Sequence, residues 1–134
     1  MKWIKEKWFK SINYYLGVLK KYAVISGRAT REEYWYFTLF STFILIVLLF
    51  SMLLSFLFVA VYYIYYLAML IPTFTVGVRR LHDIGKSGWW MAFFFIPFGP
   101  LVLLIFFLEK SEPNKNQYGS NPKISKEVGN DENK

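Results

Sequence analysis

The single histidine of the chain stands beside an acid, and this His82-Asp83 pair is the first candidate for chemistry. An imidazole can exchange protons near neutral pH, and an adjacent carboxylate can orient it. A metal site would need further ligands, but the chain has no cysteine and few carboxylates near the pair. A structural role, tying a polar loop to helix ends and headgroups, is therefore favoured. We expect no catalytic residue, no metal and no cofactor, and hence no enzyme.

Gly85-Lys86-Ser87 resembles the end of a phosphate-binding loop. The pattern GxxxxGK[ST] also requires a glycine five residues before Gly85, and that position holds Arg80. No β-strand is expected before it either, so the sequence excludes a nucleotide site of this kind.

Basic residues surround the same pair, between two apolar stretches. A guanidinium can hold a phosphate with two hydrogen bonds while its stem stays among acyl chains. We expect a site that binds lipid headgroups, chiefly anionic phospholipid, or a protein partner. Its members would be Arg79, Arg80, His82, Asp83 and Lys86. A specific site for an acidic ligand is the alternative.

The segments that carry these polar residues are separated by long apolar runs. Residues 34–78 contain no charged side chain over 45 positions, and residues 87–108 add 22 more. A helix crosses the roughly 30 Å hydrocarbon core with about 20 residues. A buried soluble core is the alternative, but about half of the chain lies in these runs, without a polar face to meet water. The sequence therefore predicts an all-α integral membrane protein.

The first run must turn, because as one helix it would be about 70 Å long. We predict helices over residues 31–57 and 62–80, joined by a short turn at 58–61. Four tyrosines follow that turn, and their hydroxyls favour the far membrane interface. They are Tyr62, Tyr63, Tyr65 and Tyr66.

The second run contains Pro97, Gly99 and Pro100 near its centre. Such residues break regular helical hydrogen bonding, so the segment is either a kinked spanning helix or a re-entrant hairpin. Each half has only about eight residues. We favour the kinked span, which gives three transmembrane helices and leaves residues 31–108 as the helical bundle.

Residues 1–30 precede the bundle with lysines and aromatic residues at nearly helical spacing. We expect an amphipathic helix in the membrane interface, and a cytosolic arm packed on the bundle is the alternative. Thr30 and Glu33 have the spacing of a capping box at the start of the first span. Trp35, and later Trp89 and Trp90, are predicted interface anchors.

The positive charge of the chain lies mainly before the first span. Residues 1–33 hold eight Lys or Arg against three Glu, whereas residues 109–134 hold five of each sign. This favours a cytoplasmic N-terminus and anionic lipid as the partner, not nucleic acid. The polar composition of residues 109–134 predicts a largely disordered tail. A kinked third span would leave the tail outside, and a re-entrant one would return it to the cytoplasm.

Four stretches of the sequence resemble a known family: residues 26–35, residues 79–90, Ile96-Pro97 and residues 116–122. The stretch RRLHDIGKSGWW is the most specific of them. Together they resemble the domain of unknown function 805 family, the YhaH-like inner-membrane proteins of bacteria, over about residues 12–123. The resemblance implies a bacterial cytoplasmic (inner) membrane location and no established activity. The lysine-rich extension before residue 12 and the short link between the first two helices depart from the family pattern.

Two hypotheses for function follow. The first is a non-enzymatic component of the membrane that binds lipid or a membrane protein partner through its inner basic loop. The alternative is a small transporter or channel component, suggested by the broken third segment and by Pro72. Three spans are few for a pore, so this alternative requires a homo-oligomer.

Overall fold

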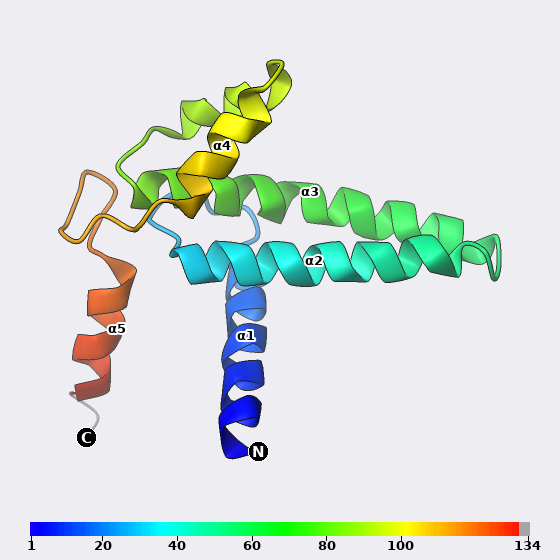
Figure 1. Cartoon of the computed structure of the whole chain (residues 1–134), viewed down its shortest axis with the longest axis horizontal. Helices are drawn as coiled ribbons and strands as arrows, with labels where there is room; N and C mark the ends of the chain where they lie inside the picture. Colours follow the sequence, from blue (N-terminus) through cyan, green and yellow to red (C-terminus); the bar gives the residue numbers. More distant parts are fainter. Residues whose placement is uncertain (132–134) are drawn as a thin grey trace.

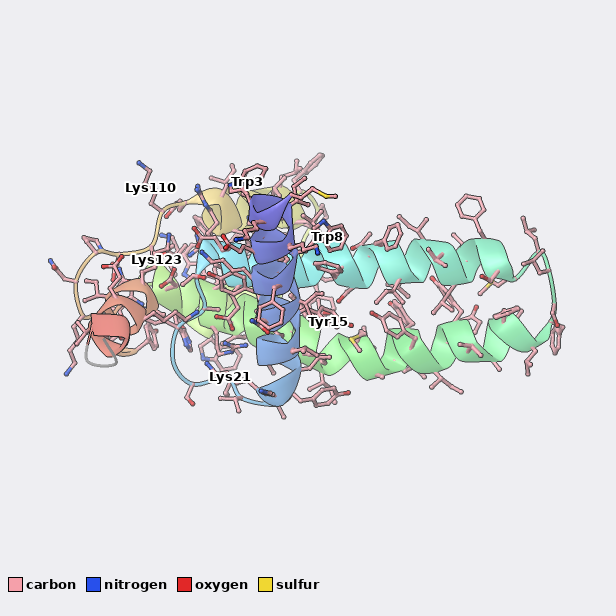
Figure 2. The ribbon with its side chains drawn as sticks, turned by 90° about the horizontal axis from the view of Figure 1, so that it is seen from below. Trp3, Trp8, Tyr15, Lys21, Lys110 and Lys123 are labelled. Carbon is pink, nitrogen blue, oxygen red and sulfur yellow. The ribbon has the colours of Figure 1, made fainter. Side chains whose placement is uncertain are left out.

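The computed structural model describes residues 1–131, and this part of the chain contains helices and no β-strand. Two long helices, α2 (Arg31–Ser51) and α3 (Leu57–Asp83), run side by side in opposite directions. Helix α1 (Lys2–Lys20) meets them near one end, and its N-terminus points away from the pair (Figure 1). Seen from below, α1 passes over both long helices at that end, while the far end of the pair stands alone (Figure 2).

Helices α2 and α3 are both long and apolar enough to cross a membrane, each with a mean hydropathy of 1.8. Only 11% of the apolar window in α2 and 6% of that in α3 is buried. The core helix of a soluble protein would be mostly covered by protein, and these helices are not. Their exposed apolar surface fits contact with acyl chains, in agreement with the predicted all-α membrane protein.

Helix α2 begins at the position that the sequence indicates. Thr30 has an extended backbone and its hydroxyl accepts a hydrogen bond from the Glu33 amide at 3.2 Å. This satisfies one of the amide donors that the first turn of a helix leaves free. The return bond of a capping box is absent, because the Glu33 carboxylate pairs with Arg79 instead.

The turn between the two long helices lies earlier than predicted. Helix α2 ends at Ser51 and α3 starts at Leu57, so the predicted turn at 58–61 is wrong. The Ser51 hydroxyl donates to the Val47 carbonyl at 2.8 Å, and the Ser55 hydroxyl accepts from the Leu57 amide at 3.3 Å. Two serines, and not the tyrosines, therefore mark the reversal. The tyrosine cluster lies within α3.

Helix α3 continues to Asp83, three residues beyond the predicted end at 80. Arg79, Arg80, His82 and Asp83 are consequently helical, and the predicted loop is restricted to the residues after them. Gly85 ends the helix with a positive φ of 73°, and the amides of Gly85 and Lys86 bond back to His82 and Leu81. This is a Schellman motif, which favours glycine at that position.

The third apolar segment is a hairpin and not one kinked rod. The 3-10 helix η1 (Gly88–Phe95) and helix α4 (Gly99–Leu108) pack against each other. The rings of Trp90 and Phe106 lie 5.2 Å apart, whereas a continuous helix would separate these residues by about 24 Å. A side chain at Gly99 would collide with the Phe93 carbonyl, so glycine allows this close reversal. The preferred kinked span is therefore not present.

The tail is also more ordered than its composition predicts. Residues 109–121 fold against the end of α3, where Glu112 donates its amide to the Asp83 carbonyl at 3.0 Å. They lead into α5 (Pro122–Asp131), which lies beyond the end of the long helices (Figure 1). The structure describes residues 109–131 as this loop and helix, and the last three positions of the predicted tail lie outside the described residues.

Protein packing is concentrated at one end of the helix pair, where α2 begins and α3 ends, and we call this the Arg79 end. One apolar cluster joins α1, α2 and α3 through Val18, Phe37 and Val76, and another joins α3 and α4 through Leu81 and Leu103. Residues 42–71 contribute no buried side chain. The end that contains the turn is therefore an exposed apolar pair of helices.

Both ends of the η1–α4 hairpin return to the Arg79 end. Trp35 donates from its indole to the Phe107 carbonyl, and Gly88 lies against Val78. Residues 1–30 and 109–131 thus emerge at the same end of the helix pair. The structure therefore matches the re-entrant alternative in two respects: the third apolar segment is a hairpin, and the two polar segments lie at one end of the helix pair.

This arrangement predicts from which side single introduced cysteines can be labelled. The native chain has no cysteine, so only the introduced thiol reacts. Ser26→Cys and Ser120→Cys, both at exposed positions, should react with a membrane-impermeant maleimide from the same side in oriented vesicles. Ser55→Cys, in the apolar turn, should not react from that side. Reaction of Ser26→Cys and Ser120→Cys from opposite sides would contradict the hairpin.

Candidate functional site

Asp83 lies at the centre of the polar cluster that closes the Arg79 end of the helix pair. Its carboxylate is fully buried and accepts from two arginines. Arg28 donates from Nε to Oδ1 at 3.0 Å, and Arg80 donates from Nη1 to Oδ2 at 2.8 Å. A buried carboxylate needs such partners, because taking its charge out of water is costly.

Arg28 joins four parts of the chain. Besides Asp83, its guanidinium donates to the carbonyls of Glu112 at 2.6 Å, Asn114 at 2.9 Å and Gly119 at 3.3 Å. The planar group has five N–H donors, and here they bind both the end of α3 and the loop of residues 109–121. Arg28 therefore fixes the post-α4 loop to the helix pair.

Arg79 and Arg80 point to different partners, although they are adjacent in sequence. Arg79 donates to Glu33 of α2 at 2.8 Å, and its backbone carbonyl accepts from the Ala29 amide at 2.9 Å. Arg80 donates to the Phe107 carbonyl at 3.3 Å and also to the Glu109 carbonyl. Together they connect α3 to the start of α2 and the end of α4.

His82 is held between two loops. Its Nδ1 lies 3.2 Å from the Gly27 carbonyl, and its ring stacks on Tyr118 with 3.8 Å between the centroids. Asn116 donates to the His82 carbonyl at 2.9 Å and to Glu112 at 2.7 Å. The imidazole and the Asp83 carboxylate therefore have separate partners, although the two residues are adjacent in sequence.

Arg79 and Arg80, which were expected to bind headgroups, are both covered by protein in this structure. Arg79 is 1% exposed and Arg80 is fully buried, and both are engaged by protein acceptors. Lys86 is partly exposed, with its ammonium 4.5 Å from the centroid of the Phe106 ring. Of the predicted basic group, only Lys86 could reach a ligand.

The predicted interface anchors divide in the same way. Trp35 bonds to the Phe107 carbonyl at 3.3 Å, and Trp90 packs against Phe93 and Phe106. Both residues help to close the Arg79 end of the helix pair. Trp89 is 87% exposed and is free to meet the membrane interface.

Several cluster members were not assigned a role from the sequence. Arg28, Glu112, Asn116 and Tyr118 all contact Asp83, His82 or each other. Three of these four lie in the stretches by which the chain resembles a family, and that pattern was the available signal. Among the described residues, no group of three or more His, Cys, Asp or Glu is placed to hold a metal ion.

Comparison with known proteins bears directly on this cluster. Residues 22–120 match the model of the family described as "Protein of unknown function (DUF805)". The chain belongs to this DUF805 family. The matched range contains every residue of the cluster from Arg28 to Tyr118, so the DUF805 region and the closed end of the fold coincide.

Two relatives of this DUF805 chain are found in Escherichia coli (strain K12). Inner membrane protein YhaI is 41% identical over 115 residues, and Inner membrane protein YhaH is 36% identical over 125 residues. Each match covers 84% of this chain and 98% of the relative. No solved structure gives a significant match. The names of both relatives give only their location in the inner membrane, and no enzymatic family is indicated.

The central position of Asp83 leads to a stability prediction. Asp83→Asn should lower the free energy of unfolding by about 3–5 kcal/mol, because it leaves buried guanidinium groups without their counter-charge. Denaturant titration of the protein in detergent micelles measures the change.

Glu32→Gln is the matched control. Glu32 pairs with Lys123 at 2.9 Å, and the two side chains are 38% and 49% exposed. Removing an exposed pair of this kind should cost about 0–1 kcal/mol. Equal losses in the two variants would show that the buried cluster does not hold the fold.

Proposed function

We propose that this DUF805 protein is a non-enzymatic component of the bacterial cytoplasmic membrane that engages anionic phospholipid from the cytoplasmic side through α1. The observation that carries the proposal is the position of α1, a lysine-rich helix that lies across the two membrane-spanning helices with its aromatic side chains exposed (Figure 2).

The orientation follows from the charges. All charged residues that the structure describes lie within 1–33, 79–86 and 109–131, and these segments meet at the Arg79 end. Cytoplasmic segments carry the excess of Lys and Arg in inner-membrane proteins. We therefore place the Arg79 end in the cytoplasm and the uncharged turn at 52–56 at the outer leaflet.

The depth of α1 fits an interfacial helix. Tyr14 stacks on Tyr36 and Trp8 packs against Phe40, so α1 crosses α2 about one and a half to two and a half turns after its start. Tyr36 is about 8 Å along α2 from Arg31 at the helical rise of 1.5 Å per residue. Interfacial helices bury their apolar side roughly 5–10 Å into the boundary between headgroups and acyl chains.

The side chains of α1 suit that position. Trp3, Trp8 and Phe9 are 65%, 59% and 70% exposed, although they are large and apolar. Lysines at 2, 5, 7 and 10 lie on the same segment with one acid, Glu6. Aromatic rings favour the interface, and each lysine near an anionic leaflet contributes about 1 kcal/mol.

The transporter alternative is not proposed. It depended on a broken third span, and η1 and α4 fold back on each other instead. No feature of the described residues favours a pore over a lipid-engaging surface.

The proposal predicts lipid enrichment around the protein. When it is extracted with its surrounding membrane into polymer nanodiscs, phosphatidylglycerol should be enriched over phosphatidylethanolamine relative to the bulk membrane. Replacing Lys2 and Lys5 with Gln should reduce this enrichment by up to about fivefold per lysine.

Lys110→Gln with Lys115→Gln is the matched control, since it removes the same charge from exposed positions outside α1. This variant should retain the wild-type lipid ratio. Equal ratios in all three proteins would count against lipid engagement by α1.

A further inference from the structure

Helices α1 and α2 enclose a groove at the level where the span meets the interface. Tyr14 stacks on Tyr36 with 5.7 Å between ring centroids, and Trp8 meets Phe40 edge-on at 6.3 Å. From this crossing the helices diverge and leave a groove of about 690 Å³. Its volume lies within the roughly 300–1,000 Å³ typical of small-molecule sites.

The floor of the groove is part of the membrane-spanning helix. It is formed by Leu39, Phe40, Phe43 and Ile44, which lie in the charge-free run of α2. Leu39 and Phe43 are 61% and 64% exposed, so the rest of the protein does not cover them. An occupant of this floor must be apolar and must come from the lipid phase.

The lining of the groove is almost entirely apolar, and Lys7 is the one charged residue among its lining residues. Lys7 and Ser11 line it from α1, one turn apart, and Tyr36 lines it from α2. The Ser11 hydroxyl donates a hydrogen bond to the Lys7 carbonyl at 2.8 Å. The Lys7 ammonium lies 4.0 Å from the centroid of the Trp3 ring and pairs with no carboxylate of the described residues. This leaves the ammonium without a counter-charge among the described residues, beside Trp3 on the α1 side of the groove.

We infer that this groove is a specific site for one anionic phospholipid of the inner leaflet. One acyl chain lies on the α2 floor, and the phosphate binds the Lys7 ammonium on the α1 side. The inference deepens the proposed function, on which it rests, by assigning a discrete site to the general attraction of α1 for anionic lipid.

The structure favours a lipid over other occupants. A water-soluble ligand would have to enter from the acyl-chain region, because the floor belongs to the span. A second copy of the chain would bring another lysine-rich α1 close to Lys7, and like charges repel. A lipid supplies both an apolar chain for the floor and an anionic headgroup for Lys7.

Native mass spectrometry of the full-length protein, released from detergent micelles after delipidation, tests the site. The probes are phosphatidylglycerol and phosphatidylcholine with identical acyl chains, which separate headgroup charge from chain binding. Wild-type protein should retain one phosphatidylglycerol in preference to phosphatidylcholine. Lys7→Gln should abolish the preference, whereas Lys5→Gln, with its lysine outside the groove, should lower it by no more than the roughly fivefold of one diffuse charge. Lys110→Gln, at an exposed position outside α1, should keep it.

A second pair of variants tests the floor. Leu39→Trp should fill the groove and lower the retention of both lipids at least fivefold. Leu49→Trp makes the same change at an exposed leucine of α2 outside the groove, and it should behave as wild type. Both positions are exposed, so neither variant is expected to disturb the fold.

Three results would overturn the site. Equal losses for Lys5→Gln and Lys7→Gln would mean diffuse attraction, and equal losses for Leu39→Trp and Leu49→Trp would mean ordinary boundary lipid. A dimer that Leu39→Trp dissociates would mean that a second copy occupies the groove. In the first two cases nanodisc enrichment that depends on Lys2 and Lys5 would still support the proposed function, so the two failures are distinguishable.

Discussion

Asp83 holds two arginines in a part of the protein that water does not reach. Arg28 comes from the segment before α2 and Arg80 from the same helix as Asp83. Each also binds a carbonyl after α4, that of Glu112 for Arg28 and that of Glu109 for Arg80. Burying these charges is favourable only when all the partners are in place. The segment before α2, the end of α3 and the loop of residues 109–121 must therefore close together. The η1–α4 hairpin and the shared side of the two polar segments follow from this closure.

The two ends of the helix pair differ in their surroundings: one is packed by protein, and the other exposes apolar side chains. At the Arg79 end, polar and apolar side chains are buried against each other, and the DUF805 stretches contribute most of the polar ones. Toward the turn, α2 and α3 expose leucine and phenylalanine, with Leu53 and Leu54 more than 80% exposed. Acyl chains are the natural complement of such a surface. The proposed lipid groove lies at the border between these two regions, where α1 leaves α2.

The sequence predicted the features that depend on local pattern and length. The two charge-free runs gave the all-helical membrane class, and the Thr30 spacing gave the start of α2. The turn was misplaced because tyrosines were taken as the interface marker, whereas the hydroxyls of Ser51 and Ser55 form the bonds at the reversal. Local pattern could not tell a kinked rod from a hairpin, since both need the same prolines and glycine.

The roles of the arginines could not be read from local sequence. Arg79 binds Glu33 across 46 positions, and Arg28 binds Asp83 across 55. A single sequence shows charge and spacing but not which distant charges meet, so an adjacent basic pair resembles a headgroup site. For a related reason, composition alone predicts disorder for the loop of residues 109–121. It contributes backbone carbonyls to Arg28, and composition does not reveal that use of the main chain.

Amide hydrogen exchange in the Asp83→Asn variant tests the central claim most directly. The amides of Ala29 and Glu112 bond to the carbonyls of Arg79 and Asp83, and those of Asn116 and Gly119 bond within the loop. If Asp83 holds the Arg79 end closed, all four of these amides should exchange faster in the variant. Amides in the middle of α2 and α3 should keep their protection. Unchanged protection at Glu112, Asn116 and Gly119 would contradict the account.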